Sequence, residues 1–334
     1  MANWYRRIAT FAVVLSLTVV VLGAWVRLSD AGLGCPDWPG CYGSLIVPAE
    51  EVEQTLANQN FPERPLEASK AWKEMIHRYV AATLGFCIVI IALLAWLNRH
   101  DKDQPVVVPL ALLALVIFQG LLGMWTVTLL LKPVIVMAHL LGGLATTALL
   151  FWLVLGTRRP SGSAGGTSHP MRALVVAGMV VLIAQIALGG WTSSNYAALA
   201  CPDIPTCQGQ WWPDQINFSE GFVMWRGLGV DYEFGVLEAP ARVAIHFTHR
   251  LGAIVTFLFL GFVAFRCFSS KQGQPAIGSA SMLVLIALLA QLSLGLAVVW
   301  FGLPLPIATA HNGVAALLLL ATVNLLHIVS RARA

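Results

Sequence analysis

Eight long apolar segments dominate the sequence. They cover about residues 8–28, 75–97, 105–130, 134–156, 172–192, 242–265, 276–300 and 305–328. An α-helix needs about 20 apolar residues to cross the hydrocarbon core of a bilayer. Only 11% of the residues are charged, whereas a soluble domain carries about 25%. This pattern argues against a very apolar soluble enzyme and predicts an all-α polytopic membrane protein with eight transmembrane helices.

The basic residues indicate the orientation of these helices. Eight spans place both termini on one side of the membrane, and the short segments on that side carry 11 of the 20 Lys and Arg residues. The opposite side has about 100 loop residues and 14 of the 16 acidic residues. By the positive-inside rule, both termini are cytoplasmic. We therefore expect a bacterial-type inner (plasma) membrane protein, and its net charge of +4 reflects orientation rather than nucleic-acid binding.

The two halves of the chain repeat each other. Gly23 and Trp25 correspond to Gly189 and Trp191 at an offset of 166 residues. After an insertion in the second half the offset becomes 172, and five polar or glycine positions then match. These pairs are Gln119 and Gln291, Gly123 and Gly295, His77 and His249, Arg78 and Arg250, and His139 and His311.

The repeat predicts the domain organisation. Residues 1–156 and 172–334 form two four-helix halves, joined by a cytoplasmic linker at 157–171 that is rich in Gly, Ser and Pro. Because each half has four spans, both have the same orientation. A pseudo-two-fold axis along the membrane normal should relate the two four-helix bundles.

Four histidines are the main functional signal. His77 and His139 are separated by 62 residues, and His249 and His311 by the same interval. All four fall near the outer ends of spans that run in the same direction. Ionisable residues inside membrane spans are costly and usually functional. Each half therefore presents two histidines at one depth on two parallel helices.

Haem is the ligand that best fits two facing imidazoles in a helix bundle. Histidines that only hydrogen-bond between helices are the alternative. A bare metal site is disfavoured because no carboxylate or thiolate accompanies each pair. Two haem sites near the outer face are thus predicted, with iron bound by His77 and His139 and by His249 and His311.

Three arginines are candidates for binding haem propionates. Arg78 and Arg250 each follow a predicted ligand and lie close to the outer surface, and Arg27 is a third candidate of the same kind. Their alternative role is to extend to the membrane interface.

One position distinguishes the two halves. Glu74 stands three residues before His77, and its counterpart at the offset of 172 is His246. A carboxylate beside a haem can act as a base or relay protons, whereas a glutamate at a helix start can also be a solvated residue. We expect the chemistry at Glu74 and a supporting role for His246.

Four of the six cysteines lie in outer loops. Cys35 and Cys41, like Cys201 and Cys207, are six residues apart. Disulfides persist on that side of the membrane, and the spacing is wider than that of usual zinc ligands. Two disulfides are the favoured interpretation, with redox-active thiols or a metal site as alternatives. Cys87 and Cys267 lie in or beside spans and are expected to be buried thiols.

At these residues the chain resembles the haem A synthase family. The resemblance spans the whole chain and rests on the segments 32–39, 74–78, 138–139, 248–252 and 310–311. It implies oxidation of a methyl group of haem O to a formyl group, by successive hydroxylations, to supply haem A to terminal oxidases. It also implies that His77 and His139 face the substrate haem, that Glu74 is catalytic, and that His249 and His311 ligate haem b.

The implied reaction needs partners. A haem O synthase-like enzyme would supply the substrate. The sequence contains no flavin or nicotinamide motif, so electrons must come from a quinol or a redox protein, and a homo-oligomer is compatible with the fold. The alternatives are a di-haem electron-transfer protein of the cytochrome b561 type and a haem transporter or chaperone. The first should place its haems towards opposite faces, and the second would not need Glu74.

Overall fold

The described part of the chain is built from α-helices. The computed structural model describes residues 2–102, 104–157, 169–270 and 275–331. Their helices are α1 (Ala2–Leu28), α2 (Glu51–Asn60), α3 (Ala68–Leu97), α4 (Val107–Thr128), α5 (Pro133–Gly156), α6 (His169–Ser194), α7 (Phe218–Gly221), α8 (Ala239–Ser269), α9 (Pro275–Trp300) and α10 (Leu305–Arg331). The four basic residues Arg158, Arg159, Lys271 and Arg333, which the orientation argument uses, lie outside the described residues.

Eight of these helices are long and apolar enough to cross a membrane. They are α1, α3, α4, α5, α6, α8, α9 and α10, and they confirm the prediction of a multi-pass membrane protein with eight spans. The main difference in bounds is that α3 begins at Ala68 rather than near residue 75. The first two turns of α3 include Lys70 and Lys73, so the apolar segment begins later than the helix.

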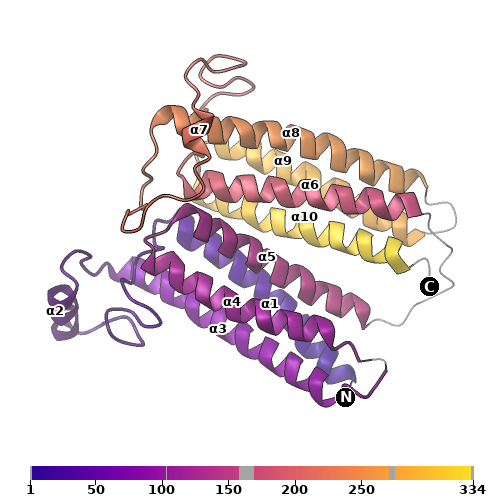
Figure 1. Ribbon diagram of the computed structural model, residues 1–334, viewed down its shortest axis with the longest axis horizontal. Helices are drawn as coiled ribbons and strands as arrows, with labels where there is room; N and C mark the ends of the chain where they lie inside the picture. Colours follow the sequence, from indigo (N-terminus) through magenta and orange to yellow (C-terminus); the bar gives the residue numbers. More distant parts are fainter. Residues whose placement is uncertain (1, 103, 158–168, 271–274, 332–334) are drawn as a thin grey trace.

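The long helices form two groups of four that lie side by side (Figure 1). In the first group α1 and α4 each contact both α3 and α5, and in the second α6 and α9 join α8 and α10 in the corresponding pattern. The groups meet where α1 and α5 pack against α6 and α10. The helices that correspond by the repeat therefore make corresponding contacts.

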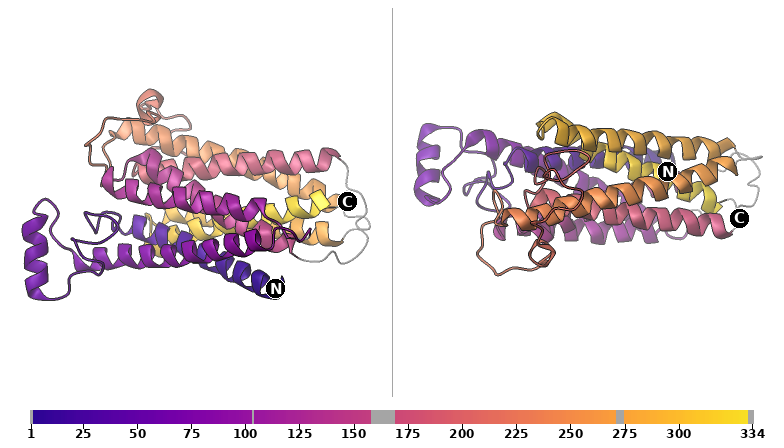
Figure 2. Two further views of the ribbon diagram at one scale, coloured as in Figure 1. Left: turned by 60° about the horizontal axis from the view of Figure 1, so that its bottom comes forward. Right: turned by 90° about the horizontal axis from the view of Figure 1, so that it is seen from above.

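The two long loops lie together at one end of the molecule. Figures 1 and 2 show the loops that contain α2 and α7 at this end, while the start of α1 and the end of α10 lie at the other. The histidine-bearing helices α3, α5, α8 and α10 all begin at the loop end. The four repeated histidines consequently lie in the halves of these helices that are nearer the loops.

Contacts between loops join the two groups of helices. Arg64 of the first loop forms ion pairs with Asp231 at 2.5 Å and Glu233 at 2.8 Å in the second long loop. Lys132, between α4 and α5, donates to the carbonyl of Gly227 at 3.1 Å and lies over the ring of Trp225 at 3.7 Å. Residues 225–233 of the second group thus extend across the loop end of the first.

Two short helices, α2 and α7, were not predicted. Glu50 and Glu53 form a capping box at the start of α2, and the side chain of Asn217 caps α7. Both helices lie in polar loops, where there is no long apolar segment to reveal them.

Candidate functional site

Each of the four repeated histidines packs against a glycine of a neighbouring helix. The position that a Cβ would take on Gly23 lies 3.0 Å from Cε1 of His77, and the corresponding distance from Gly189 to His249 is 3.2 Å. The second histidine of each half shows the same contact. Gly123 faces His139 at 3.5 Å, and Gly295 faces His311 at 3.0 Å. The glycines that mark the repeat in the sequence are therefore the residues that make room for the imidazole rings.

In the first half, the two histidines line one cavity. The cavity measures about 700 Å³ and is also lined by Glu74, Arg78 and Arg27. The Nδ1 atoms of both His77 and His139 are buried and have no hydrogen-bond partner. The structure thus brings the predicted substrate-haem ligands, the predicted catalytic carboxylate and two predicted propionate-binding arginines to one space.

In the second half, glutamines contact both histidines. The amide nitrogen of Gln185 lies 3.0 Å from Nδ1 of His249 and donates at 3.0 Å to the backbone carbonyl of the same residue. The amide nitrogen of Gln291 lies 3.2 Å from Nε2 of His311. The two contacts use different ring nitrogens, Nδ1 in His249 and Nε2 in His311, and Nδ1 of His311 is buried without a hydrogen-bond partner.

The glutamines differ between the halves. Gln291 corresponds to Gln119, which lines the cavity of the first half and has a buried amide nitrogen without a partner. Gln185 corresponds to Val19 at the offset of 166, so His77 has no such neighbour. The sequence analysis assigned no role to Gln185. Its only signal was a polar residue in the apolar run of α6.

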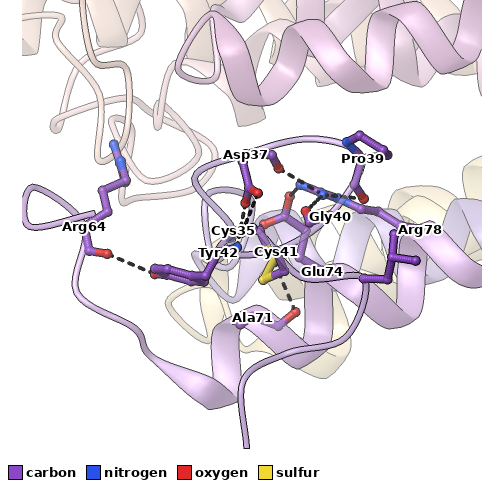
Figure 3. Close-up of a disulfide and its surroundings, with 12 residues drawn as sticks. Cys35, Asp37, Pro39, Gly40, Cys41, Tyr42, Arg64, Ala71, Glu74 and Arg78 are labelled. Carbon is purple, nitrogen blue, oxygen red and sulfur yellow. Dashed lines mark hydrogen bonds and ion pairs between the residues drawn. A yellow bond between two sulfur atoms is a disulfide. The ribbon is translucent and has the colours of Figure 1, made fainter. Parts of the chain in front are cut away.

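Glu74 is buried and bonded to the first disulfide loop. Its side chain is 5% exposed and accepts a hydrogen bond from the backbone N–H of Cys35 at 2.9 Å. The guanidinium group of Arg78 forms an ion pair with the same carboxylate at 2.5 Å (Figure 3). Gly34 permits this approach, because a Cβ there would lie 2.6 Å from the backbone of Lys70 at the start of α3.

Arg78 also holds the disulfide loop directly. It donates to the backbone carbonyls of Asp37, Pro39 and Gly40, the last at 2.5 Å. Asp37 in turn accepts from the backbone N–H groups of Tyr42 and Gly43. Figure 3 shows these groups gathered around the Cys35–Cys41 disulfide.

The second half contains the same construction with one exchange. Arg250 donates to the carbonyls of Cys201, Asp203 and Thr206. His246 takes the place of Glu74, with its Nδ1 atom 3.1 Å from the N–H of Cys201 and its Nε2 atom 3.3 Å from Nε of Arg250. Both ring nitrogens of His246 therefore face donors in the loop and the helix.

Arg27 forms an ion pair with Asp30 at 3.8 Å and donates to fewer backbone carbonyls than Arg78 or Arg250. It lines the first cavity, donates to the carbonyl of Ser193 at 2.7 Å and lies 4.1 Å from the ring centroid of Tyr196. Its Nε atom is buried without a hydrogen-bond partner. Ser193 is also the residue that corresponds to Arg27 at the offset of 166. The second half therefore has no arginine at this position.

The outer cysteines form the two predicted disulfides. Cys35 pairs with Cys41 and Cys201 with Cys207, while Cys87 and Cys267 are buried free thiols. His327 lies near the far end of α10, and its ring centroid is 4.8 Å from that of Trp152.

The donor groups fit haem better than a bare ion. Among the described residues, no group of three or more His, Cys, Asp or Glu side chains is placed to hold a metal ion. Two imidazoles, space around them, and an arginine with an unpartnered nitrogen match a porphyrin with acidic substituents. The fold and these residues define a class: a multi-pass helical membrane protein whose two halves each carry a repeated pair of partly buried histidines, with a cavity beside the pair of the first half.

Comparison with known proteins identifies the family. Residues 6–323 match the family model COX15-CtaA, described as cytochrome oxidase assembly protein. A protein of Shewanella oneidensis named "Heme A synthase" is 46% identical over 97% of this chain and 95% of its own length. Proteins with the same name from Halalkalibacterium halodurans and Rhizorhabdus wittichii are each 26% identical, over 99% and 96% of this chain and 99% and 91% of their own lengths. The chain belongs to the COX15-CtaA family of cytochrome oxidase assembly proteins.

Proposed function

We infer that this chain is a haem A synthase, a membrane enzyme that oxidises a methyl substituent of haem O to a formyl group. Membership of the family and similarity over nearly the whole chain to curated haem A synthases support the activity. The observation that carries the assignment to particular residues is the shared cavity of His77, His139 and Glu74.

His77 and His139 bind the iron of the substrate haem in this proposal. Their rings come from α3 and α5, and Gly23 and Gly123 leave room for them. Glu74 lies one helical turn from His77 and lines the same cavity. Its carboxylate oxygens are placed to take up a proton released as the methyl group is oxidised.

His249 and His311 hold haem b in the second half. Bound haem b would supply electron transfer to the substrate site. Gln185 and Gln291 contact the two imidazoles. Since His246 replaces Glu74, the second half has no carboxylate at this position beside its histidine pair.

The three arginines divide into two roles. Arg78 and Arg250 hold the disulfide loops over the two sites through backbone carbonyls. Arg27, with its buried unpartnered Nε in the cavity, is the arginine best placed to pair with a propionate of the substrate haem. Arg78 lines the same cavity and can contribute a second contact.

The domain organisation follows from the repeat. Residues 1–156 form the substrate half and residues 172–334 the haem b half, joined by the linker at 157–171 and related by a pseudo-two-fold axis along the membrane normal. The corresponding contacts within the two groups of helices support this arrangement. The positive-inside rule places both termini in the cytoplasm and the haem sites near the outer face.

Two partners follow from the reaction. An enzyme that makes haem O must supply the substrate, and a quinol or a redox protein must supply electrons. The haem A product would then pass to a haem-copper terminal oxidase.

Expression with a source of haem O tests the function. Haems extracted from cells that produce the chain should include hydroxylated and formyl forms by mass spectrometry, and cells without the chain should contain haem b and haem O but neither oxidised form. Absence of both oxidised forms under aerobic conditions would exclude the synthase and favour haem transport or electron transfer.

A further inference from the structure

The cavity of the first half extends well beyond the histidines. Along α3 its lining continues from His77 to Val89, a distance of about 18 Å at 1.5 Å per residue. On α5 it continues from His139 to Thr146, and on α1 it reaches Ser16. All three helices carry the lining away from the disulfide loop, so the cavity continues towards the end of the bundle where α1 begins.

Small residues make this extension. Gly85 lies on α3 and Gly120 on α4, and both line the cavity together with Ser16 and Thr146. A Cβ on Gly120 would have no atom within 4 Å, and a Cβ on Gly85 would meet only Val116, at 3.9 Å. There is thus free volume beside Gly85, and Gly120 lies where the cavity opens to the surface.

The second half fills the corresponding space with bulky apolar side chains. At the repeat offsets, Ser16 corresponds to Leu182 and Thr146 to Leu318. Leu182 is 3% exposed and Leu318 is 1% exposed, and both belong to the hydrophobic core of that half.

Gly85 follows the same rule, because it corresponds to Phe257, which packs against the core of the second half. Gly120 corresponds to the larger Leu292.

Two lining positions of α3 are reversed, since Leu84 corresponds to Thr256 and Val89 to Gly261. At Gly261 the side chain of Leu288 lies 3.8 Å from where a Cβ would stand, so that space is also occupied.

Both halves thus contain the histidine pair, but within the described residues only the first half has the cavity extension that continues along the helices away from the disulfide loop. Haem O differs from haem b in carrying a long isoprenoid (hydroxyethylfarnesyl) chain in place of a vinyl group. An apolar chain gains about 0.8 kcal/mol for each methylene buried, so a haem with such a chain is favoured where an apolar compartment adjoins the iron ligands.

We propose that the extension bounded by Ser16, Gly85, Gly120 and Thr146 holds the isoprenoid chain of the substrate haem. The proposal rests on the function inferred above and names the residues that distinguish the two haems. Leu182, Phe257 and Leu318 close the same space in the second half and restrict it to a haem without the chain.

The cavity also offers a route for the chain. Val89 on α3 is 45% exposed and Ile117 on α4 is 60% exposed, and both line the cavity. The compartment therefore reaches the molecular surface between α3 and α4, at a depth that faces lipid. A haem with an apolar chain can enter there from the bilayer without passing through water.

The test fills the compartment with the residues of the second half. Full-length protein that already carries haem b is titrated, without reductant, with ferric haem O or ferric haem b, and the Soret change reports occupancy of the remaining site. Three variants are compared with wild type: Thr146→Leu, Gly85→Phe and Ser16→Leu. Leu93→Phe serves as a matched control, since Leu93 is an exposed residue of α3 that does not line the cavity.

Wild type and Leu93→Phe should bind haem O at least ~10-fold more tightly than haem b at this site. Each filling variant should lose that preference while its affinity for haem b stays within about two-fold of wild type. The reciprocal variant Leu318→Thr should increase retention of haem O in the second half, measured as haem O extracted per polypeptide.

Two outcomes would overturn the compartment: filling variants that still prefer haem O, or filling variants that lose both haems equally. Either outcome leaves the synthase activity standing if wild-type protein still produces formyl haem from haem O. Failure of the wild type to produce it would instead overturn the proposed function.

Discussion

Glu74 accepts a hydrogen bond from the backbone N–H of Cys35 at 2.9 Å, and His246 meets the N–H of Cys201 at 3.1 Å. Both side chains therefore join the start of a histidine-bearing helix to a disulfide loop. They differ in that one is a carboxylic acid and the other an imidazole. The same position thus holds a carboxylate in the first half and an imidazole in the second.

Replacing Glu74 separates its structural from its chemical role. Glu74→Gln keeps an oxygen that can accept a hydrogen bond from the N–H of Cys35 but removes the carboxylate base. Glu74→His places the residue of the second half, histidine, at the same position. Both should lower the rate of haem O oxidation by ~10²-fold or more while the absorption spectrum of haem b is unchanged. Loss of haem b in either variant would contradict the assignment of Glu74 to the substrate half.

Much of this construction follows from the sequence, because its signals are periodic or repeated. Long apolar runs reveal the eight spans, and the equal separations of His77 from His139 and of His249 from His311 reveal the paired sites. The spacing of Cys35 and Cys41 also predicts a disulfide that the structure contains.

Other features depend on contacts that no local pattern records. Arg78 and Arg250 follow histidines in the sequence, but their guanidinium groups donate to loop carbonyls more than 30 residues away in the chain. Gln185 reaches His249 only because α6 packs against α8. Tertiary packing determines which groups these side chains contact. A single sequence shows that an arginine or a glutamine is present, but it does not show which residue that side chain will contact.

The glycines beside the histidines should determine haem retention in each half separately. In Gly189→Val the added side chain would overlap the ring of His249, since even a Cβ lies 3.2 Å from its Cε1 atom. Haem b per polypeptide should fall by at least half, with the substrate site still able to take up haem O. Gly23→Val should show the opposite selectivity, through His77.

A control for these variants is Gly156→Ala at the end of α5, where an added Cβ meets no atom within 4 Å. It should leave both haem contents at the wild-type level. Equal loss of both haems in Gly189→Val would indicate general misfolding and contradict the separate roles.

The ion pairs of Arg64 should couple the two loops. Arg64→Gln removes contacts to Asp231 and Glu233. Because such surface pairs contribute about 0–1 kcal/mol each, the fall in thermal stability should be small. Hydrogen exchange at residues 225–233 should nevertheless become faster. Arg226→Gln, which removes an ion pair to Glu220 within the same loop, is the matched control, and exchange at residues 61–67 should change only in the Arg64 variant.

Asp203 should stabilise the second disulfide loop over a wide pH range. The hydroxyl of Thr206 and the backbone N–H groups of Gln208 and Gly209 donate to its carboxylate and lower the pKa of Asp203 from 3.8 to about 2. A carboxylate whose pKa is depressed in the folded state contributes stability that is fully present above its unfolded pKa and is lost as the pH falls through the folded value. Between pH 7 and about 4 the stabilisation by Asp203 should therefore be constant, so this group should add no pH dependence to the rate at which a phosphine reduces the Cys201–Cys207 disulfide. Asp203→Asn should be reduced faster than wild type throughout that range, with Cys35–Cys41 in the same molecule as the internal reference. Equal rates for the two proteins at neutral pH, or a wild-type transition centred near pH 6, would show that Asp203 does not hold the loop.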